Sequence, residues 1–138
     1  PMSANKHLLY IEDDLKSREI MRLMMTHVIK DCTLTVLEGG NDFLNQLRCL
    51  PTPPDLILMD IQMYPLDGFG LLAQLRSQPA YMQTPVVALT ASVMSDEVER
   101  IKEGGFDGII AKPISPHVFP GLITRLLKGE SVWHVAED

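Results

Sequence analysis

Four short apolar runs recur along the chain, at Leu8–Ile11, Leu56–Met59, Val86–Leu89 and Gly108–Ala111. Continuous apolar residues without polar alternation are typical of strands that are buried on both faces. A fifth run, Leu34–Leu37, alternates apolar and polar residues more clearly, and we expect it to form a strand at the edge of the sheet.

Segments with helical spacing of apolar residues separate these runs. The clearest stripes are Met21, Met24, Met25 and Val28 after the first strand, and Leu71, Leu72 and Leu75 after the third. We interpret both stripes as core-facing, because methionines at this spacing favour core filling over an adaptable binding groove.

Capping and breaking residues agree with this division. We expect Asn41 to cap the second helix, and Ser115–Pro116 to supply the cap and first position of the last helix. The pair Gly104–Gly105 ends the fourth helix, and Pro85 precedes the fourth strand. The order is strand then helix, five times. Such alternation predicts right-handed crossovers and an α/β fold, with a parallel sheet covered by helices on both faces.

Size and composition predict one compact domain. The 138 residues, 46% of them hydrophobic, suffice for one core, which we place in residues 1–128. Residues 129–138 are predicted to form a C-terminal tail, in which Trp133 is either a docking contact or without a role. Pro1 before Met2 indicates a segment excised from a longer chain or a cloning remnant.

The charge and the cysteines exclude several classes of function. A net charge of −6 argues against binding to nucleic acid or to an anionic membrane, since both partners favour clustered Lys and Arg. Cys32 and Cys49 lack the spacing of a zinc site or a disulfide framework, so a reducing cytoplasm fits best. No apolar run is long enough for a membrane span, and no signal peptide opens the chain.

Polar residues follow the predicted strands at one edge of the sheet. They are Glu12, Asp13 and Asp14 after the first strand, Asp60 at the end of the third, Thr90 after the fourth, and Lys112 and Pro113 after the last. Ligands of open α/β sheets bind at the carboxyl ends of the strands, so this edge is the place to expect a site. A sheet has no structural need for charges there, because buried charges are costly unless paired.

This set of residues suits phosphoryl transfer. Three neighbouring carboxylates need a cation, and oxygen ligands at low count indicate Mg²⁺ or Mn²⁺. Asp60 is the expected nucleophile, because a carboxylate can attack phosphorus without a general base. Lys112 and Thr90 would stabilise charge on the equatorial oxygens. The alternative is that these residues share no function. They would then be an acidic helix cap, a loop acid and a surface lysine, each of which is plausible alone.

The sequence resembles the response-regulator receiver family of two-component signalling from His7 to Lys128. The resemblance is carried by five segments together, namely residues 10–14 (YIEDD), 59–63 (MDIQM), 67–68 (DG), 88–91 (ALTA) and 111–114 (AKPI). It implies a flavodoxin-like, doubly wound (βα)5 fold with a five-stranded parallel sheet in the order 2-1-3-4-5.

The resemblance also implies a role for each site residue. Asp60 would be the phosphoacceptor, Glu12 and Asp13 the acidic pair, and Gln62 the residue whose backbone carbonyl reaches the metal. The switch pair would be Thr90 and Lys112, with a cis peptide bond between Lys112 and Pro113. Asp14 falls outside the acidic pair, and we interpret it as the N-cap of the first helix.

Two positions depart from the family pattern. Tyr64 stands where a proline is usual, four residues after Asp60, and Pro65 follows it. Ile109 stands where many receivers have a Tyr or Phe that rotates on phosphorylation. We therefore expect the output to depend on the loop after Thr90 and on the face of the fourth helix.

The resemblance implies a histidine kinase or histidine phosphotransfer domain as donor, with self-phosphorylation and autodephosphorylation, and it leaves a phosphorylation-dependent dimer open. A stand-alone regulator, a truncated regulator and the receiver segment of a hybrid sensor kinase all stay open. Residues 88–91 (ALTA) and 111–114 (AKPI), together with Gln62, resemble the receivers of hybrid kinases.

A phosphatase of the haloacid-dehalogenase type is the alternative, but it needs a second acid where Gln62 stands. A flavin or nucleotide site lacks its glycines after the first strand. The four histidines, His7, His27, His117 and His134, have no metal-ligand spacing.

Overall fold

The structure is a computed structural model that describes residues 5–28 and 31–135. The side chains of His27 and Val28 lie outside the described part of the chain. The prediction that Val28 faces the core therefore concerns a side chain that the structure does not describe. The strands are β1 (Lys6–Ile11), β2 (Cys32–Leu37), β3 (Leu56–Asp60), β4 (Val86–Thr90), β5 (Gly108–Ala111) and β6 (Val132–His134). The helices are α1 (Leu15–Val28), α2 (Phe43–Arg48), α3 (Gly68–Arg76), α4 (Ser95–Glu103) and α5 (Phe119–Leu127), with 3-10 turns η1 (Gly40–Asp42) and η2 (Pro79–Tyr81).

All the strand pairs of the sheet are parallel, and the strand order is β2-β1-β3-β4-β5-β6. The predicted order 2-1-3-4-5 is confirmed, and β2 lies at an edge as its alternating sequence indicated. Asp60 pairs with Leu89, and Thr90 pairs with Ala111. The ends of β3, β4 and β5 are therefore level, and the residues that follow them meet at one edge of the sheet.

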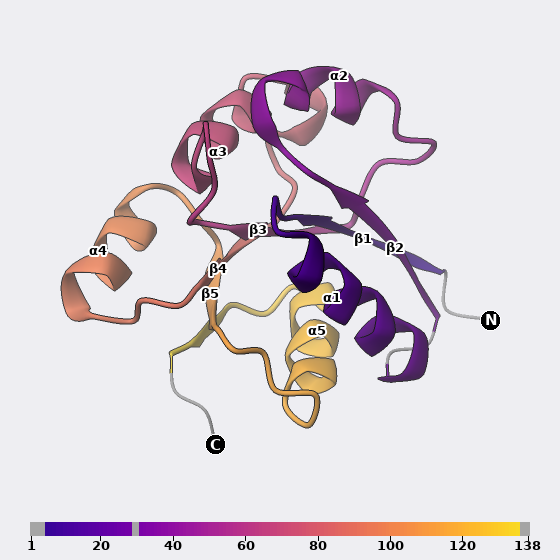
Figure 1. Ribbon diagram of the computed structural model, residues 1–138, viewed down its shortest axis with the longest axis vertical. Coiled ribbons are helices and arrows are strands. Elements are labelled where there is room, and N and C mark those ends of the chain that lie inside the picture. Colours follow the sequence, from indigo (N-terminus) through magenta and orange to yellow (C-terminus); the bar gives the residue numbers. More distant parts are fainter. Residues whose placement is uncertain (1–4, 29–30, 136–138) are drawn as a thin grey trace.

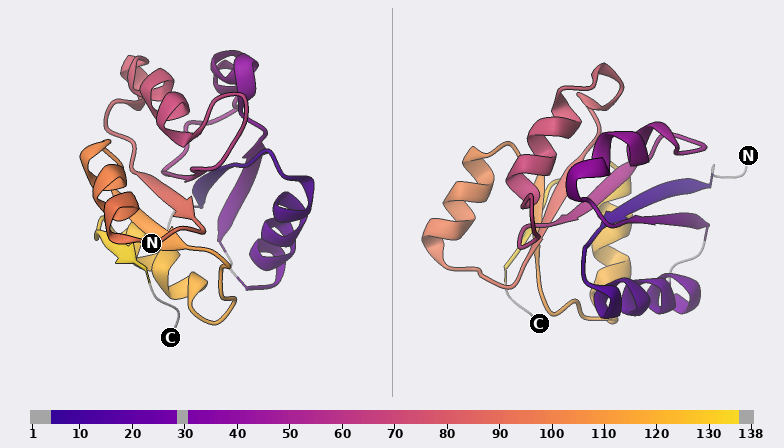
Figure 2. Two further views of the ribbon diagram at one scale, coloured as in Figure 1. Left: turned by 60° about the vertical axis from the view of Figure 1, so that its left-hand side comes forward. Right: turned by 45° about the horizontal axis from the view of Figure 1, so that its top comes forward.

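Helices cover both faces of the sheet (Figures 1 and 2). Alternate residues of a strand point to opposite faces, so Leu8 of β1 packs in the cluster that α1 and α5 complete, whereas Leu9 packs in the cluster of α2, α3 and α4. The two predicted stripes are confirmed as core. Their described members are all buried: Met21, Met24, Met25, Leu71, Leu72 and Leu75.

The prediction that Asn41 caps the second helix was wrong. Gly39 and Gly40 both have positive φ, at 79° and 78°, and they turn the chain directly into η1. Asn41 therefore lies inside this 3-10 turn, and α2 begins only at Phe43, which is fully buried. The side chain of the preceding Asp42 accepts a hydrogen bond from the Asn45 side chain instead of capping the helix.

The predicted start of the last helix was also wrong. Ser115 opens a turn, in which its carbonyl oxygen accepts hydrogen bonds from the backbone N–H groups of Val118 and Phe119. Helix α5 begins at Phe119, with Pro120 in its first turn, where a proline is tolerated. The chain thus makes one more turn before the helix, and Phe119 enters the core. The Gly104 end of α4 and the position of Pro85 before β4 are as predicted.

The segment predicted as a tail contributes a sixth strand. Strand β6 pairs with β5 through Gly108 and Val132, Ile109 and Trp133, and Ile110 and His134. Gly108 makes this pairing possible, because a Cβ atom there would collide with the carbonyl oxygen of Val132. None of the helices within residues 5–28 and 31–135 has the length and apolarity that crossing a bilayer requires.

Candidate functional site

Glu12 follows β1 and is 1% exposed. Its backbone N–H donates to the carbonyl oxygen of Leu37 at 3.0 Å, which holds it beside the end of β2. Its carboxylate accepts hydrogen bonds from the Tyr10 hydroxyl at 3.0 Å and from the backbone N–H of Asp14 at 3.2 Å. A buried carboxylate needs such partners, so Glu12 is fixed in one orientation.

The next two acids have different surroundings. Asp13 is exposed, and its carboxylate accepts a hydrogen bond from the backbone N–H of Tyr64 at 3.1 Å, which draws the loop after β3 towards it. Asp14 accepts from the backbone N–H and the hydroxyl of Ser17 at 2.9 and 2.7 Å. These bonds lower the pKa of Asp14. The prediction that Asp14 is the N-cap of α1 is confirmed.

Asp60 is the last residue of β3 and is 3% exposed. One carboxylate oxygen accepts from the backbone N–H of Gln62 at 3.3 Å, and the other lies 3.4 Å from the Nζ atom of Lys112. The same Nζ lies 3.2 Å from a carboxylate oxygen of Glu12. Lys112 thus bridges the two buried acids, and the predicted cis peptide bond between Lys112 and Pro113 is confirmed.

Burial and crowding shift the pKa values of these groups. Burial, together with the neighbouring Glu12, raises the pKa of Asp60 to about 7, against the opposing pull of the Lys112 charge. Burial would also raise the pKa of Glu12, but hydrogen bonding with Asp60 and the charge of Lys112 outweigh it and lower that pKa. The pKa of Lys112 is lowered by burial and raised more strongly by the two carboxylates. Burial and the proximity of the two carboxylates therefore favour a shared proton on the Glu12–Asp60 pair at a higher pH than is usual for a carboxyl group.

Three carboxylates gather at this edge. Oxygen atoms of Glu12, Asp13 and Asp60 lie within 4.8 Å of one another. A small set of oxygen ligands suits a hard cation such as Mg²⁺, which keeps several waters and accepts a phosphate oxygen. Lys112 contacts two of the three carboxylates, Glu12 and Asp60, so a single ammonium group lies beside three acids. The residues present therefore fit a divalent cation.

Thr90 is the last residue of β4, and its side chain is fully buried. Its hydroxyl accepts hydrogen bonds from the side-chain amide of Gln62 at 3.2 Å and from the backbone N–H of Ser92 at 3.0 Å, and it donates to the Ser92 carbonyl at 3.1 Å. The hydroxyl is thus engaged by its own loop and by the loop after Asp60. The predicted metal contact of Gln62 concerns its backbone carbonyl and stays a prediction.

Sequence reasoning missed several contacts of this site. Tyr10 was treated as part of an apolar run, although a buried phenol usually finds a polar partner. Tyr10 and Glu12 are two residues apart, so in extended chain they share a face, and this spacing was the available signal. The cis peptide bond between Tyr64 and Pro65 was also not anticipated. The hydrogen bond from Tyr64 to Asp13 had no signal in the sequence.

The other positions singled out in the sequence lie away from the acidic cluster. Ile109 is fully buried in the core cluster of α2, α3 and α4. His7 has a structural environment, with its two ring nitrogens 2.7 Å from the Thr35 hydroxyl and 3.1 Å from the Thr52 hydroxyl. His117 is exposed and His134 is half-buried.

Comparisons with known proteins agree with this geometry. The family model described as the response regulator receiver domain matches residues 8–124. Two-component system protein A of Emericella nidulans is 30% identical over 113 residues, which are 82% of this chain and 16% of that protein. The signal transduction histidine-protein kinase BarA of Escherichia coli K12 is 26% identical over 125 residues, 91% of this chain and 13% of that kinase. This chain therefore spans only a small part of the length of these two relatives.

A solved structure has the same arrangement of strands and helices. It is the signal receiver domain of a signal transduction histidine kinase from Syntrophus aciditrophicus, with a TM-score of 0.75 and 29% identity. The match covers 90% of this chain and 91% of that one. The alternative of a haloacid-dehalogenase-like phosphatase finds no support in these relatives, which agrees with an amide, Gln62, two residues after Asp60.

Proposed function

This chain belongs to the response regulator receiver family of two-component signalling, and from that premise we propose that Asp60 is the residue that accepts a phosphoryl group. The observation that carries the proposal is the buried Asp60 carboxylate at the carboxyl edge of the sheet, 3.4 Å from Lys112 and beside two further acids. Burying a carboxylate costs folding free energy, and a buried acid with a raised pKa beside other charged groups is typical of a functional site.

A divalent cation, Mg²⁺ or Mn²⁺, is part of the proposal. Glu12, Asp13 and Asp60 would hold it with their carboxylates, and Gln62 with its backbone carbonyl. Bound there, the cation would keep Asp60 ionised and neutralise charge on the incoming phosphoryl group. The hydrogen bond from Tyr10 keeps Glu12 in place for this role.

Transfer from a phosphohistidine would then follow a simple course. A carboxylate oxygen of Asp60 attacks phosphorus, and the bond between phosphorus and the donor nitrogen breaks. The electron pair of that bond remains on the imidazole, whose nitrogen takes up a proton. Lys112, already 3.4 Å from Asp60, faces the charge that spreads over the phosphoryl oxygens.

Thr90 and Lys112 make the switch in this proposal. A phosphoryl group adds about −1.5 to −2 charge and three acceptor oxygens. The Thr90 hydroxyl accepts from the Gln62 amide and donates its proton to the Ser92 carbonyl oxygen, and it would donate that proton to a phosphoryl oxygen instead. Its loop would move inward with it, and the surface of α4 would change.

The donor would be a histidine kinase or a histidine phosphotransfer domain, met in the cytoplasm. The phosphoacceptor unit would comprise residues 1–128, with 129–138 appended to it. Two-component system protein A and BarA are several times longer than this chain, which supports placing the unit in a hybrid sensor kinase. Phosphorylation-dependent dimerisation is a further part of the proposal.

Intact-mass spectrometry tests the phosphoacceptor. The purified chain, given Mg²⁺ and a small acyl phosphate, should gain one phosphoryl group that is stable in acid and labile in alkali. The Asp60→Asn variant should gain none. Asp96→Asn, which alters an exposed acid of α4, is the matched control and should be labelled like the wild type. Equal labelling of the Asp60→Asn variant would refute the assignment.

A further inference from the structure

The last described segment of the chain covers the edge of β5, and this coverage rests on one buried side chain. Val132 is 2% exposed and packs in the core cluster with α5, whereas Trp133 is 37% exposed and His134 is half-buried. Strand β6 is three residues long and pairs with β5 along one side only. A strand of this length at an edge is held by few hydrogen bonds, so it belongs to the parts of a fold that open most easily.

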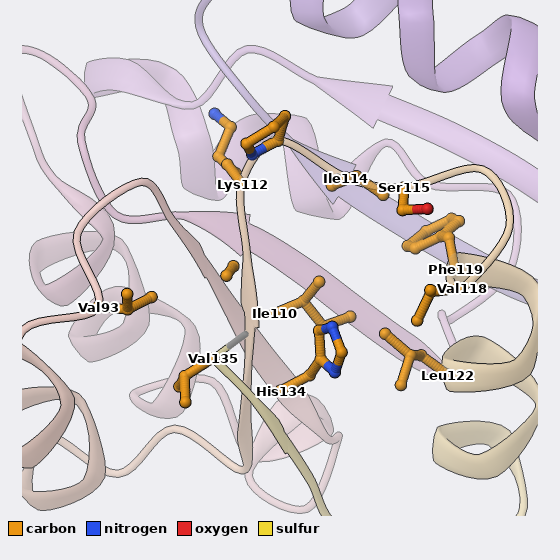
Figure 3. Close-up of a pocket in the computed structure, with 12 residues that line it drawn as sticks. Val93, Ile110, Lys112, Ile114, Ser115, Val118, Phe119, Leu122, His134 and Val135 are labelled. Carbon is orange, nitrogen blue, oxygen red and sulfur yellow. The ribbon is translucent and has the colours of Figure 1, made fainter. Parts of the chain in front are cut away.

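The side chains of this segment reach two different parts of the molecule. The Trp133 ring lies under the ammonium of Lys102, a residue of α4, at 5.4 Å from the ring centroid. His134 and Val135 help to line a cavity of about 130 Å³. Figure 3 shows Val135 on the Val93 side of this cavity and the His134 ring on the side of Leu122, in α5.

The same cavity is lined by residues of the two loops that follow the proposed switch pair, Thr90 and Lys112. Val93 belongs to the loop between Thr90 and α4, and Lys112–Ser115 belong to the loop between β5 and α5. Thr90 and Lys112 are the residues proposed to take new partners when a phosphoryl group arrives. Movement of these loops would change the contacts of His134 and Val135, and such a difference between the two states of the site is the condition for coupling.

We propose that the outer edge of β5 is a strand-docking surface that residues 132–135 of this chain occupy in cis, and that phosphoryl transfer to Asp60 weakens this docking. Phosphorylation then frees both the β5 edge and the β6 segment. The free edge then presents the backbone groups of β5 that β6 covers in the resting state. This inference rests on the proposed function of Asp60. It adds a segment, residues 132–135, whose docking responds to phosphorylation of Asp60.

Backbone amide hydrogen exchange on the full chain tests the proposal, with beryllium fluoride and Mg²⁺ as the phosphoryl analogue. Exchange at Trp133 and His134 should become at least about tenfold faster when the analogue is bound. Because coupling is reciprocal, a variant that displaces β6 should bind the analogue about fivefold more tightly or better.

Gly108→Ala is that variant, since its new Cβ collides with the Val132 carbonyl oxygen. Gly121→Ala is the matched control, because a Cβ at Gly121 meets nothing within 4 Å. The control should bind the analogue like the wild type. Trp133→Ser, which removes the contact with Lys102 from an exposed position, should act in the same direction as Gly108→Ala and keeps the test valid should the glycine variant not fold.

The outcomes separate this proposal from the function on which it rests. Analogue that binds the wild type but not Asp60→Asn, with unchanged exchange in β6, would overturn the coupling and leave the phosphoacceptor intact. Wild-type protein that fails to bind the analogue would overturn both. Faster exchange in β6 together with tighter binding by Gly108→Ala and normal binding by Gly121→Ala would support the proposal.

Discussion

The side-chain amide of Gln62 donates a hydrogen bond to the Thr90 hydroxyl at 3.2 Å, and so links the loop after β3 to the end of β4. In the proposed switch the Thr90 hydroxyl takes a new position, in which it donates its proton to a phosphoryl oxygen instead of the Ser92 carbonyl oxygen. The hydrogen bond that it now accepts from the Gln62 amide favours the resting position. We predict that Gln62→Ala raises the affinity for beryllium fluoride by about fivefold, the equivalent of one hydrogen bond of about 1 kcal/mol. Titration calorimetry measures this change.

Gln83→Ala, at an exposed position outside the site, is the control and should have wild-type affinity. Weaker binding by Gln62→Ala would mean that the amide holds Thr90 where a phosphoryl group needs it. In that case the hydrogen bond would belong to the phosphorylated state as well.

Substitution of two neighbouring acids, Asp13 and Asp14, should distinguish metal binding from helix capping. Asp13 belongs to the carboxylate cluster, whereas Asp14 accepts two hydrogen bonds from Ser17 at the start of α1. We predict that Asp13→Ala lowers the affinity for Mg²⁺ by at least about tenfold, as expected for a lost ligand. Asp14→Ala should keep the affinity for Mg²⁺ and lower the melting temperature, since a cap is lost. A larger effect of Asp14 on Mg²⁺ binding would show that the assignment of the acidic pair is shifted by one residue.

The acidic edge could be predicted from the sequence because it follows from two simple facts. Apolar runs mark buried strands, and parallel strands carry their carboxyl ends to one side. Asp60 and Thr90 are the last residues of β3 and β4, so once the strands were recognised their convergence was determined. The structure brings Glu12, Asp13, Asp60 and Lys112 together as this reasoning required.

Other features depended on contacts that are distant in sequence. Strand β6 has three residues, too few for a recognisable period, and its place depends on the missing Cβ of Gly108. The two wrong helix starts have a similar cause. Asn41 and Ser115 are good capping residues, but the burial of Phe43 and Phe119 decided where the helices begin. Local propensity was overruled by packing.

The raised pKa of Asp60, about 7, predicts a pH dependence in metal-free buffer. An acid whose pKa is higher in the folded than in the unfolded protein adds stability at low pH, and this contribution is lost as the pH rises through the folded value. The wild type should therefore lose thermal stability between about pH 4 and pH 7, relative to Asp60→Asn, whose side chain does not titrate. Melting curves with a chelator measure the difference. Added Mg²⁺ should remove it, and equal pH profiles without metal would contradict the raised pKa.

The last prediction concerns which residue transmits the signal to α4. Ile109 is fully buried, so Ile109→Ala would leave a cavity in the core and lower the free energy of unfolding by about 2–5 kcal/mol. This loss of stability would obscure any effect on signal transmission. Ile109→Val is the better variant for this test, because it should lower the free energy of unfolding by only about 0.5–1.5 kcal/mol. We predict that Ile109→Val changes phosphorylation little and keeps the normal response. In contrast, Thr90→Ala should still accept a phosphoryl group but lose the response on α4, because the hydroxyl that bonds the new oxygens is gone.

Backbone amide NMR shifts, with and without beryllium fluoride, distinguish these outcomes in the wild type and both variants. The wild type and Ile109→Val should show shifts across Val93–Gly105, the loop and helix that follow Thr90. Thr90→Ala should show shifts only near Asp60, because the site then has no contact on β4 that differs between its two states. A full pattern of shifts on α4 in Thr90→Ala would assign the transmission to another residue, and Lys112, which contacts Asp60 from the end of β5, would be the next to replace.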